Sequence, residues 1–312
     1  MQRLALLFIL VLACLAASAH ESMSLRELML SFGTDLDKAK VRRETLAPGL
    51  YILFGAGGNV VVSIGDQGVL MVDSQFPEML PMLKGAIREV GGGEIDFTIN
   101  THWHFDHADS NPMLGREGSW MISHINSRRM MLNESTIDYG DRFYKQPPYP
   151  AEGLPVLTFD DTMQMFFNGQ RIDILHFGSA HTTGDAVVWF RHDNVIHMGD
   201  VFVTRFPFID TGNGGNLDGV IAFSKAVLEI IDEDTAIVCG HGPVATYDDL
   251  VDYVAMLDAV RDRMMSLIDR GYSLQAVMEA RPTDDFDGKY GNAAGFIARA
   301  YDDLTRQVPA RR

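Results

Sequence analysis

The chain has 312 residues, of which 46% are hydrophobic and 22% are charged. This composition is typical of a globular protein with a sizeable core, and the length allows one large domain or two small ones. The formal net charge is −16, with 42 acidic and 26 basic residues. Because such a surface repels phosphate backbones, the composition disfavours a nuclease or another nucleic-acid-binding protein.

The N-terminus has the pattern of a secretory signal peptide. Arg3 supplies a positive charge, residues 4–15 form an apolar run, and Ala17-Ser18-Ala19 is a small-residue cleavage site. We therefore expect a signal peptide over residues 1–19, cleavage after Ala19, and a mature protein that is periplasmic or secreted. The alternative is a lipoprotein signal with a lipid anchor on Cys14, which ranks lower because the A-x-A site is the cleaner signal.

The rest of the chain has one cysteine, Cys239, so we expect no internal disulfide in the mature protein. The apolar run at the N-terminus is too short for a comfortable membrane span, and no later run reaches that length without charges. We therefore predict no transmembrane segment.

Residues 20–46 form a predicted N-terminal leader segment that is polar and helix-prone. Within it, apolar residues recur at i, i+3, i+4 and i+7 and predict an amphipathic helix. These residues are Leu25, Leu28, Met29 and Phe32. From Leu50 onward, β-type runs at 51–54, 60–63 and 69–73 are separated by glycine-rich turns.

The first β-rich block is followed by a predicted helix over 78–90, a strand over 95–100, a histidine-rich loop and a helix over about 124–133. Residues 134–155 carry four prolines and are predicted to form an irregular surface loop.

A second β-rich block has predicted strands at 163–167, 171–177, 186–191 and 195–198, with a hairpin turn at Asn168-Gly169. A helix over 217–231, a strand over 235–239 and helices over about 247–270, 273–280 and 293–307 follow. The chain thus repeats a β-meander followed by helices. This order predicts an α/β fold in which two sheets pack face to face with helices outside, a four-layer body rather than two independent domains.

Side chains that bind metals are concentrated in the loop after the predicted strand 95–100. His102, His104, Asp106 and His107 form an H-x-H-x-D-H pattern. If the chain leaves the strand still extended, His102 and His104 converge, while the start of a helix turns Asp106 and His107 elsewhere. Imidazoles and a carboxylate suit Zn²⁺ or a similar first-row metal. A solvated polar loop is the alternative, but a short histidine-rich tract is itself a metal signal.

Three further candidate ligands follow predicted strand ends. His181 lies in a loop between two β-runs, Asp200 ends the run 195–200, and His241 directly follows the strand 236–238. Glycine or another small residue flanks each one and lets the backbone approach a metal closely. Together the two regions offer seven candidate metal ligands: His102, His104, Asp106, His107, His181, Asp200 and His241.

This ordered set resembles the metallo-β-lactamase superfamily over about residues 50–253. The resemblance implies an αββα sandwich over a hydrolase domain that we place at residues 47–312, and a site for two metals, normally Zn²⁺. By this analogy His102, His104 and His181 bind one metal and Asp106, His107 and His241 bind the second, while Asp200 bridges them. Asp73 matches a position that orients a histidine.

The sequence departs from common family patterns in two places. Many members have glycine soon after the position of His107, whereas this chain reads Ala108-Asp109-Ser110. A bridging aspartate such as Asp200 resembles the glyoxalase II-like and lactonase-like branches, and many dedicated β-lactamases lack it. The second departure weakens a specific prediction of antibiotic hydrolysis.

The resemblance implies an enzyme in which two metals hold a bridging hydroxide that opens a carboxylic acid derivative. The substrate would be a small molecule: a β-lactam-type cyclic amide, a lactone, an ester or a thioester. Asp106 is the predicted catalytic residue, because it would be both a ligand and the acceptor that orients the nucleophile. Export disfavours cytosolic glutathione thioesters and favours β-lactams, lactones and envelope esters.

The alternative from another class is an iron-dependent redox enzyme on the same fold, similar to persulfide dioxygenases. A flavin-coupled oxygen reductase of this fold usually has glutamate at the position of His104 and an added flavin domain, and the sequence shows neither. The sequence leaves the oligomeric state open.

Residues 206–210 and 212–216 follow Asp200 and are predicted to form a loop over the metals with an apolar wall. Trp103 and Phe105 are predicted to pack in the core. The segment 290–292 is a weaker candidate for reaching the site. The remaining histidines that we expect to be structural or exposed are His124, His176, His192 and His197.

Overall fold

The computed structural model describes residues 21–307. The predicted signal peptide over 1–19 and the alternative lipid anchor at Cys14 therefore lie outside the described residues. Within the described range, no helix combines the length and the apolarity that a membrane span requires.

The first large sheet has seven strands in the order β10-β7-β6-β5-β4-β3-β2. The strands are β2 (Arg42–Ala47), β3 (Leu50–Phe54), β4 (Val60–Gly65), β5 (Gly68–Val72), β6 (Phe97–Ile99), β7 (Trp120–His124) and β10 (Leu157–Phe159). Strands β2 to β5 form an antiparallel meander, whereas β5, β6 and β7 pair in parallel. The carboxyl ends of β5 and β6 therefore lie at one edge of the sheet, where Asp73 and the histidine-rich loop begin.

The second large sheet has six strands in the order β11 to β16. The strands are β11 (Thr162–Phe167), β12 (Gln170–Leu175), β13 (Val187–Phe190), β14 (Val195–His197), β15 (Ala236–Val238) and β16 (Val244–Ala245). Only β14 and β15 pair in parallel. Because their carboxyl ends share an edge, the segments that carry Asp200 and His241 leave the sheet side by side.

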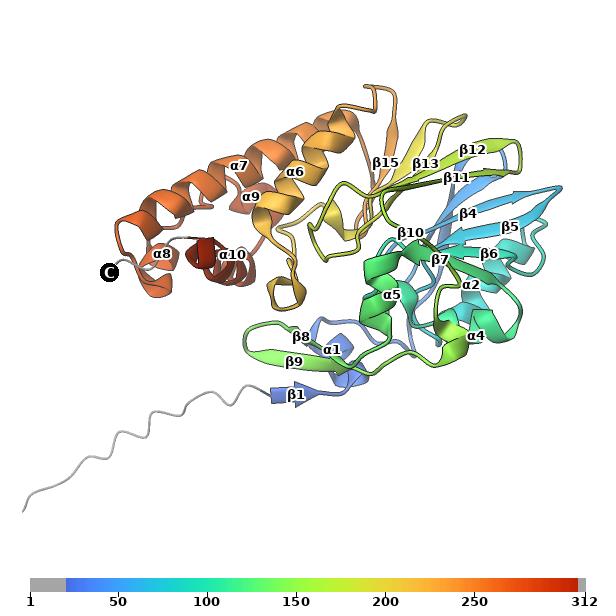
Figure 1. The fold of residues 1–312 in the computed structure, drawn as a ribbon, viewed down its shortest axis with the longest axis horizontal. Coiled ribbons are helices and arrows are strands. Elements are labelled where there is room, and N and C mark those ends of the chain that lie inside the picture. The colour runs from blue at the N-terminus through green and yellow to red at the C-terminus, as the bar shows by residue number, and fades with distance from the viewer. Residues whose placement is uncertain (1–20, 308–312) are drawn as a thin grey trace, which may run out of the picture.

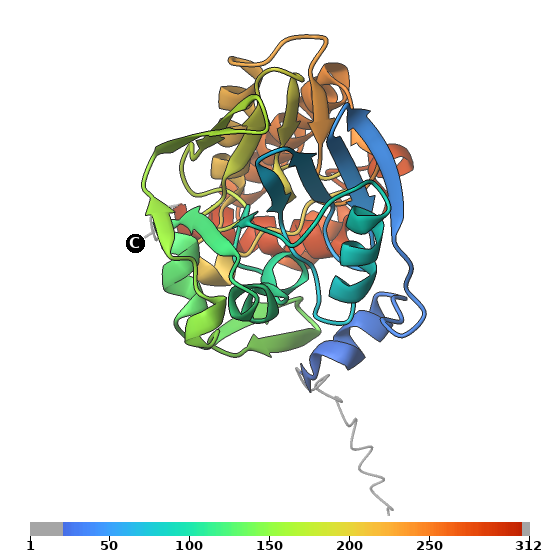
Figure 2. The ribbon, with the colours of Figure 1, turned by 90° about the vertical axis from the view of Figure 1, so that its right-hand side faces the viewer.

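The two sheets pack face to face, and helices cover both outer faces (Figures 1 and 2). A buried cluster that includes Ile52, Val72 and Ile122 of the first sheet and Ile174 and Val188 of the second fills the space between them. Strands β4 and β13 are apolar almost throughout, because both faces of each strand are covered. The predicted four-layer αββα sandwich is confirmed.

The helices divide into two outer layers. The layer over the first sheet contains α1 (Leu25–Ser31), α2 (Leu80–Arg88), α3 (Phe105–Ala108), α4 (Asn111–Arg116) and α5 (Ile125–Met131). The layer over the second sheet contains α6 (Leu217–Leu228), α7 (Tyr247–Asp269), α8 (Leu274–Glu279), α9 (Asp287–Tyr290) and α10 (Ala294–Gln307). Each layer shares a buried apolar cluster with the sheet beneath it.

The prediction of an irregular loop over residues 134–155 is wrong in its first half. Strands β8 (Ser135–Asp138) and β9 (Arg142–Gln146) form a hairpin, and β1 (Glu21–Met23) pairs in parallel with β9 to make a small third sheet. The burial of β8 alternates with period two, whereas the prolines begin only after Gln146. The irregular segment is therefore confined to the residues after β9.

Other elements were missed or shifted. Strand β2 lies in the segment predicted as helix-prone, and β7 and α4 lie in a stretch without a predicted element. Strand β14 ends at His197, so Asp200 lies in the following 3₁₀ turn, Gly199–Val201, rather than at the strand end.

Candidate metal centre

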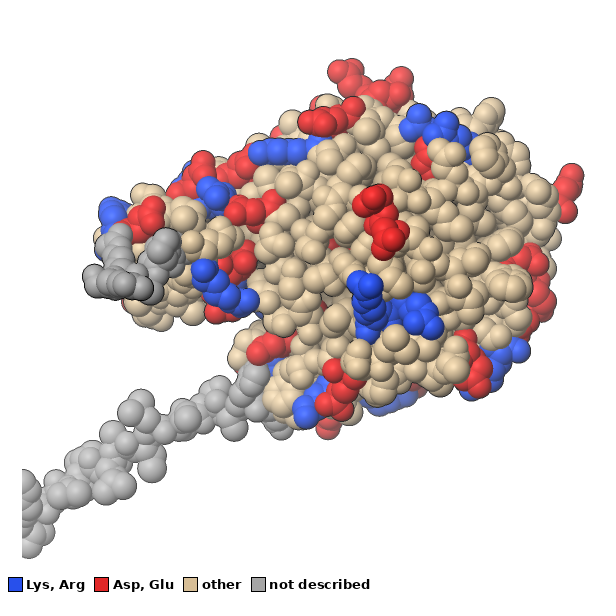
Figure 3. All heavy atoms as spheres, in the orientation of Figure 1, with Lys and Arg blue, Asp and Glu red and all other residues tan. Residues whose placement is uncertain are grey.

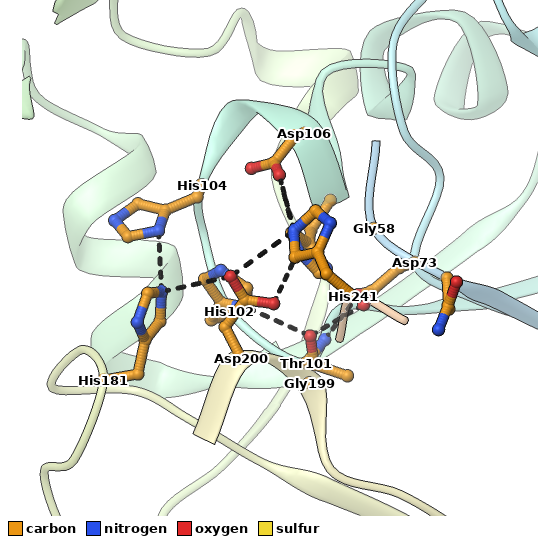
Figure 4. A network of polar contacts seen from close by, with 12 residues as sticks. Gly58, Asp73, Thr101, His102, His104, Asp106, His181, Gly199, Asp200 and His241 are labelled. Carbon is orange, nitrogen blue, oxygen red and sulfur yellow. Dashed lines mark hydrogen bonds and ion pairs between the residues drawn. The ribbon is translucent and has the colours of Figure 1, made fainter. Parts of the chain in front are cut away.

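The candidate site lies where the segments after β5 and β6 of the first sheet meet those after β12, β14 and β15 of the second. All seven predicted ligands come together there. Figure 4 labels six of them, His102, His104, Asp106, His181, Asp200 and His241, and shows their side chains converging on one space. The four histidines His102, His104, His107 and His181 are buried, Asp200 keeps 12% of its side chain exposed, and Asp106 and His241 keep 17% and 19%. These two face the pocket described below.

The first group consists of His102, His104 and His181, whose ligand atoms all lie within 4.8 Å of one another. His104 Nδ1 and His181 Nε2 are 2.9 Å apart. His104 is the residue before α3 and has extended backbone angles, so its side chain points back beside His102, as the extended exit from the strand predicts.

The second group consists of Asp106, His107 and His241, and Asp200 lies between the two groups. His241 Nε2 is 3.0 Å from Asp106 Oδ2, and His107 Nε2 is 3.2 Å from Asp200 Oδ1. Asp200 Oδ2 lies 3.5 Å from His241 Nε2 and 3.8 Å from His181 Nε2. The Asp200 carboxylate therefore contacts a histidine of each group.

The outer nitrogen of each buried histidine has a hydrogen-bond acceptor. His107 Nδ1 donates to Asp73 Oδ2 at 2.7 Å, and His104 Nε2 donates to Asp210 Oδ2 at 2.9 Å. His181 Nδ1 donates to the carbonyl oxygen of Phe208 at 2.8 Å. These bonds assign the proton to the outer nitrogen, so the inner nitrogen carries a free lone pair. The predicted role of Asp73 as the residue that orients a histidine is confirmed.

The inner atoms fit a divalent cation. His102 Nε2, His107 Nε2 and Asp200 Oδ1 are buried without a hydrogen-bond partner, although buried polar atoms are nearly always paired. With the protons assigned as above, the lone pairs of His104 Nδ1 and His181 Nε2 face each other across 2.9 Å. Two facing lone pairs repel unless a cation lies beside them. The donor set is therefore the one that a metal requires.

The pKa values fit the same interpretation. Burial lowers the pKa of His181 to about 4, and the neighbouring His104 adds to this effect. Burial also raises the pKa of Asp106, but His107 and His241 outweigh it and lower that pKa to about 2. Burial lowers the pKa of His241, but Asp200 and Asp106 outweigh it and raise the value to about 9. The carboxylates thus attract a positive charge to this place, and a bound metal would replace the proton on His241.

Two glycines allow the close packing of the ligands. A Cβ atom on Gly58 would collide with the His107 ring, and one on Gly240 would collide with the Asp200 carboxylate. Any larger residue at either position would displace a ligand.

A pocket of about 400 Å³ opens over the two groups. Phe206 and Phe208 line it, as the predicted loop over the metals requires, and Phe105 reaches it from the core. Trp103 is buried in the core as predicted. The weaker prediction for residues 290–292 is wrong for Tyr290, whose ring packs behind Phe206 and does not line the pocket.

Sequence reasoning missed several residues that line this pocket. They are Met29, Phe32, Thr34, Ala56, Tyr139, Arg205 and Arg299. Arg205 could have been found, because it lies five residues after Asp200 and directly before the predicted loop. Tyr139 and Arg299 belong to distant elements and have no local signal. Asp210, the partner of His104, was inside the predicted loop without an assigned role.

The four histidines outside the candidate ligand set within residues 21–307 are structural or exposed, as predicted. His197 is buried and bonds the carbonyl oxygen of Asn59 and the backbone N–H of Gly199. His124 caps α5 and stacks on His176 with ring centroids 3.8 Å apart. His192 is exposed.

The chain matches the family model of the metallo-β-lactamase superfamily over residues 54–241, and it belongs to this superfamily. All seven candidate ligands lie inside the matched range, whereas α7, α8 and α10 lie outside it. Members of the superfamily are mostly metal-dependent hydrolases.

Solved structures agree in fold. A metallo-β-lactamase from Pontibacter korlensis is 13% identical, with a TM-score of 0.57 over 70% of this chain and 99% of that chain. The metallo-β-lactamases DIM-1 and TMB-1 are 17% and 15% identical, each with a TM-score of 0.56 over 70% of this chain and 97% of theirs. No curated protein sequence matches the chain. At these identities the likeness establishes the fold.

Proposed function

We propose that the protein is an exported hydrolase that holds two zinc ions and opens a carboxylic acid derivative. The substrate class is a β-lactam-type cyclic amide, a lactone, an ester or a thioester. The observation that carries the proposal is the pair of three-residue donor groups with the Asp200 carboxylate between them and with inner lone pairs left unpaired.

The chemistry of the donors favours zinc. Nitrogen and carboxylate oxygen are its usual ligands together with thiolate. Burial raises the pKa of the nearby Cys239 to about 12, and its thiol donates to the carbonyl oxygens of His241 and Pro243. Cys239 is therefore not a thiolate ligand, and His102, His104 and His181 would hold one ion while Asp106, His107 and His241 hold the other.

Bound zinc ions would supply Lewis acidity and lower the pKa of a water molecule towards neutrality. The protein contributes the orientation of the reactants. The Asp106 carboxylate faces the pocket in its charged form and can accept a hydrogen bond from the attacking water. The rings of Phe206 and Phe208 form a wall that excludes bulk water from the reacting bond.

The pocket volume of about 400 Å³ suits a small molecule. The likeness to proteins named as metallo-β-lactamases supports a cyclic amide as one candidate. Export rests on the signal-peptide pattern of residues 1–19. An N-terminus at His20 in protein recovered from the periplasm or medium is the expected result, and an intact N-terminus would contradict it.

The first experiment measures the metal content of the purified mature protein together with turnover of a chromogenic cephalosporin, a lactone and an aryl ester. We expect two zinc ions per chain and hydrolysis of at least one substrate. One iron per chain without hydrolysis would reject the proposal in favour of redox chemistry.

Variants locate the activity. His104→Ala and Asp106→Ala should each lose at least one metal and most of the hydrolysis, and Asp200→Asn should weaken retention of the second metal most. His192→Ala, at an exposed histidine outside the site, is the matched control. Full activity in either alanine variant of the site would refute the assignment.

A further inference from the structure

One side of the pocket carries positive charge. Arg205 and Arg299 line the same cavity as His104, Asp106 and His241. Arg299 lies on α10, outside the residues that match the family model. It is thus a feature of this chain's C-terminal helices, and the surface is notched between these helices and the β8–β9 hairpin (Figure 3).

Arg299 has no anionic partner among the described residues. Its Nε is buried without a hydrogen-bond partner, and no ion pair joins its guanidinium to a carboxylate of the described residues, although Asp138 and Asp210 lie near enough to favour its charged form. The neighbouring Asp210 is already engaged, because its oxygens accept hydrogen bonds from His104 Nε2 and Asn213 Nδ2. The Arg299 guanidinium stacks over the Phe208 ring, at 4.4 Å from its centroid.

An unpaired and largely buried guanidinium is costly. Other arginines of the C-terminal helices are paired: Arg261 with Asp218 and Arg263 with Asp285. Burial lowers the pKa of Arg299 to about 10, so the side chain stays charged at neutral pH. Asp138 and Asp210 favour the charged form from nearby without an ion pair to Arg299, so a direct anionic partner would come from the contents of the pocket.

The wall beside Arg299 is aromatic. The rings of Phe32 and Tyr139 lie 5.1 Å apart between centroids, and those of Tyr139 and Phe208 lie 4.8 Å apart. Phe32, Tyr139 and Phe208 all line the pocket. A planar guanidinium fork matches a carboxylate or a phosphate, and an aromatic wall matches an apolar body.

We propose that the molecule bound in this pocket carries an anionic group, carboxylate or phosphate, on an apolar body, with the anion held by Arg299. The aromatic wall packs against the apolar body, and the exposed Arg205 attracts the anion at the mouth of the pocket. The statement that this molecule is also the substrate rests on the proposed function.

Calorimetric titration of the zinc-loaded protein tests the proposal with three probes of similar shape: 4-phenylbutyrate, 3-phenylpropyl phosphate and the neutral 4-phenylbutyramide. At least one anion should bind about tenfold or more tightly than the amide, as expected for charge-assisted hydrogen bonds. Whichever anion binds more tightly identifies the group. Equal affinity for the amide and both anions would overturn the proposal.

The substitution Arg299→Gln should remove about tenfold or more of the affinity for the preferred anion and leave that for the amide unchanged. Arg88→Gln removes the same charge from an exposed position on α2 and should change neither. An unchanged affinity for the anion in Arg299→Gln would show that the metals alone bind it, and would overturn the proposal.

Arg299→Lys provides a second variant that keeps the charge and removes the fork. It should bind the anion several-fold more weakly than the unaltered protein does, and it should bind the amide with the same affinity. If the variant binds the anion as tightly as the unaltered protein, that result would count against Arg299, even if Arg299→Gln fails to fold. Binding is measured without turnover. If anions bind in an Arg299-dependent way but nothing is hydrolysed, the proposed function is rejected and this inference stands. If hydrolysis occurs without a preference for anions, this inference is rejected and the proposed function stands.

Discussion

At the scale of single residues, Asp73 organises the histidine-rich loop. Its carboxylate accepts hydrogen bonds from the backbone N–H and the hydroxyl of Thr101, at 2.8 and 2.7 Å, and from His107 Nδ1. The backbone of Asp73 has φ +62°, a left-handed conformation that costs of order 1–3 kcal/mol in a non-glycine residue. The three hydrogen bonds offset this cost and hold the His107 ring with Nε2 towards the site.

Asp73→Asn should lower the affinity for the metal held by His107 about 10- to 100-fold. An amide with its oxygen at the Oδ2 position presents its NH₂ to the backbone N–H of Thr101, and one with its oxygen at the Oδ1 position presents its NH₂ to His107 Nδ1, so either orientation sets two donors against each other. Competition with a chromogenic chelator measures the effect. Asp66→Asn, in an exposed turn, is the control, and an unchanged affinity in Asp73→Asn would contradict the role of Asp73.

His124 makes the stability of the fold depend on pH. Burial lowers its pKa from 6.5 to about 4, and the neighbouring His176 contributes. Its Nδ1 accepts a hydrogen bond from the backbone N–H of Asn126 at the start of α5, which requires the neutral ring. The unfolded chain binds a proton below about pH 6.5 and the folded chain only near pH 4, so this contribution to stability is lost as the pH falls between these values.

Urea unfolding in the presence of chelator should therefore be measured at pH 7.5 and at pH 5. The free energy of unfolding should fall less between these two pH values in His124→Asn than in the unaltered protein. Asparagine also caps helices, so the cap is retained without the titration. His192→Asn is the control at an exposed histidine. The same pH dependence in His124→Asn and the unaltered protein would refute the prediction.

At the scale of elements, the segment after the predicted signal peptide is part of the core. Ser24 and Glu27 form a capping box at the start of α1, and Leu28 is fully buried. Strand β1 pairs with β9, and Gln146 of β9 accepts from the backbone N–H of Phe105 and donates to the carbonyl oxygen of Trp103. The small sheet therefore holds the backbone on both sides of His104.

Leu28→Ala should lower the free energy of unfolding by about 2–5 kcal/mol, because it leaves a cavity in the cluster beneath α1. Leu30→Ala, on the exposed face of the same helix, should change it by less than about 0.5 kcal/mol. Denaturant unfolding of both variants measures the difference. Equal stability of the two variants would show that α1 does not contribute to the core.

At the scale of the whole molecule, the metal centre joins the two sheets. The ligands of each group come from both halves of the sandwich: His102 and His104 with His181, and Asp106 and His107 with His241. Without a cation, buried lone pairs and carboxylates are left facing one another between the sheets. Bound metal should therefore stabilise the packing of one half against the other.

Removal of metal should lower the midpoint of thermal unfolding by about 5 °C or more, since a ligand at 1,000 times its Kd contributes about 4 kcal/mol. Differential scanning fluorimetry with and without chelator measures the shift. His104→Ala should respond less to chelator, and His192→Ala should respond like the unaltered protein. A midpoint that does not depend on chelator would contradict the coupling.

The sequence by itself determined the two sheets, most of the helices and all seven candidate ligands. The strands and helices could be predicted because hydrophobic periodicity is a local property of the sequence. The ligands could be predicted to converge because the carboxyl ends of parallel strands bring the residues that follow them to one edge of the sheet. The expected positions of Phe206 and Phe208 followed from their place after Asp200. The division of the ligands into two groups was implied by the family resemblance, whereas the tautomers of the histidines needed the structure.

Only the tertiary structure decided what surrounds the ligands. Strand β1 pairs with β9 across about 120 residues of sequence, and the pairing of short strands carries no local signal. Arg299 reaches the pocket because α10 packs beside α7 and the loop after Asp200, and nothing in its own neighbourhood of the chain distinguishes it from a surface arginine. The ligands follow closely on strands that define the fold, whereas the pocket wall is assembled from segments that only long-range packing brings together.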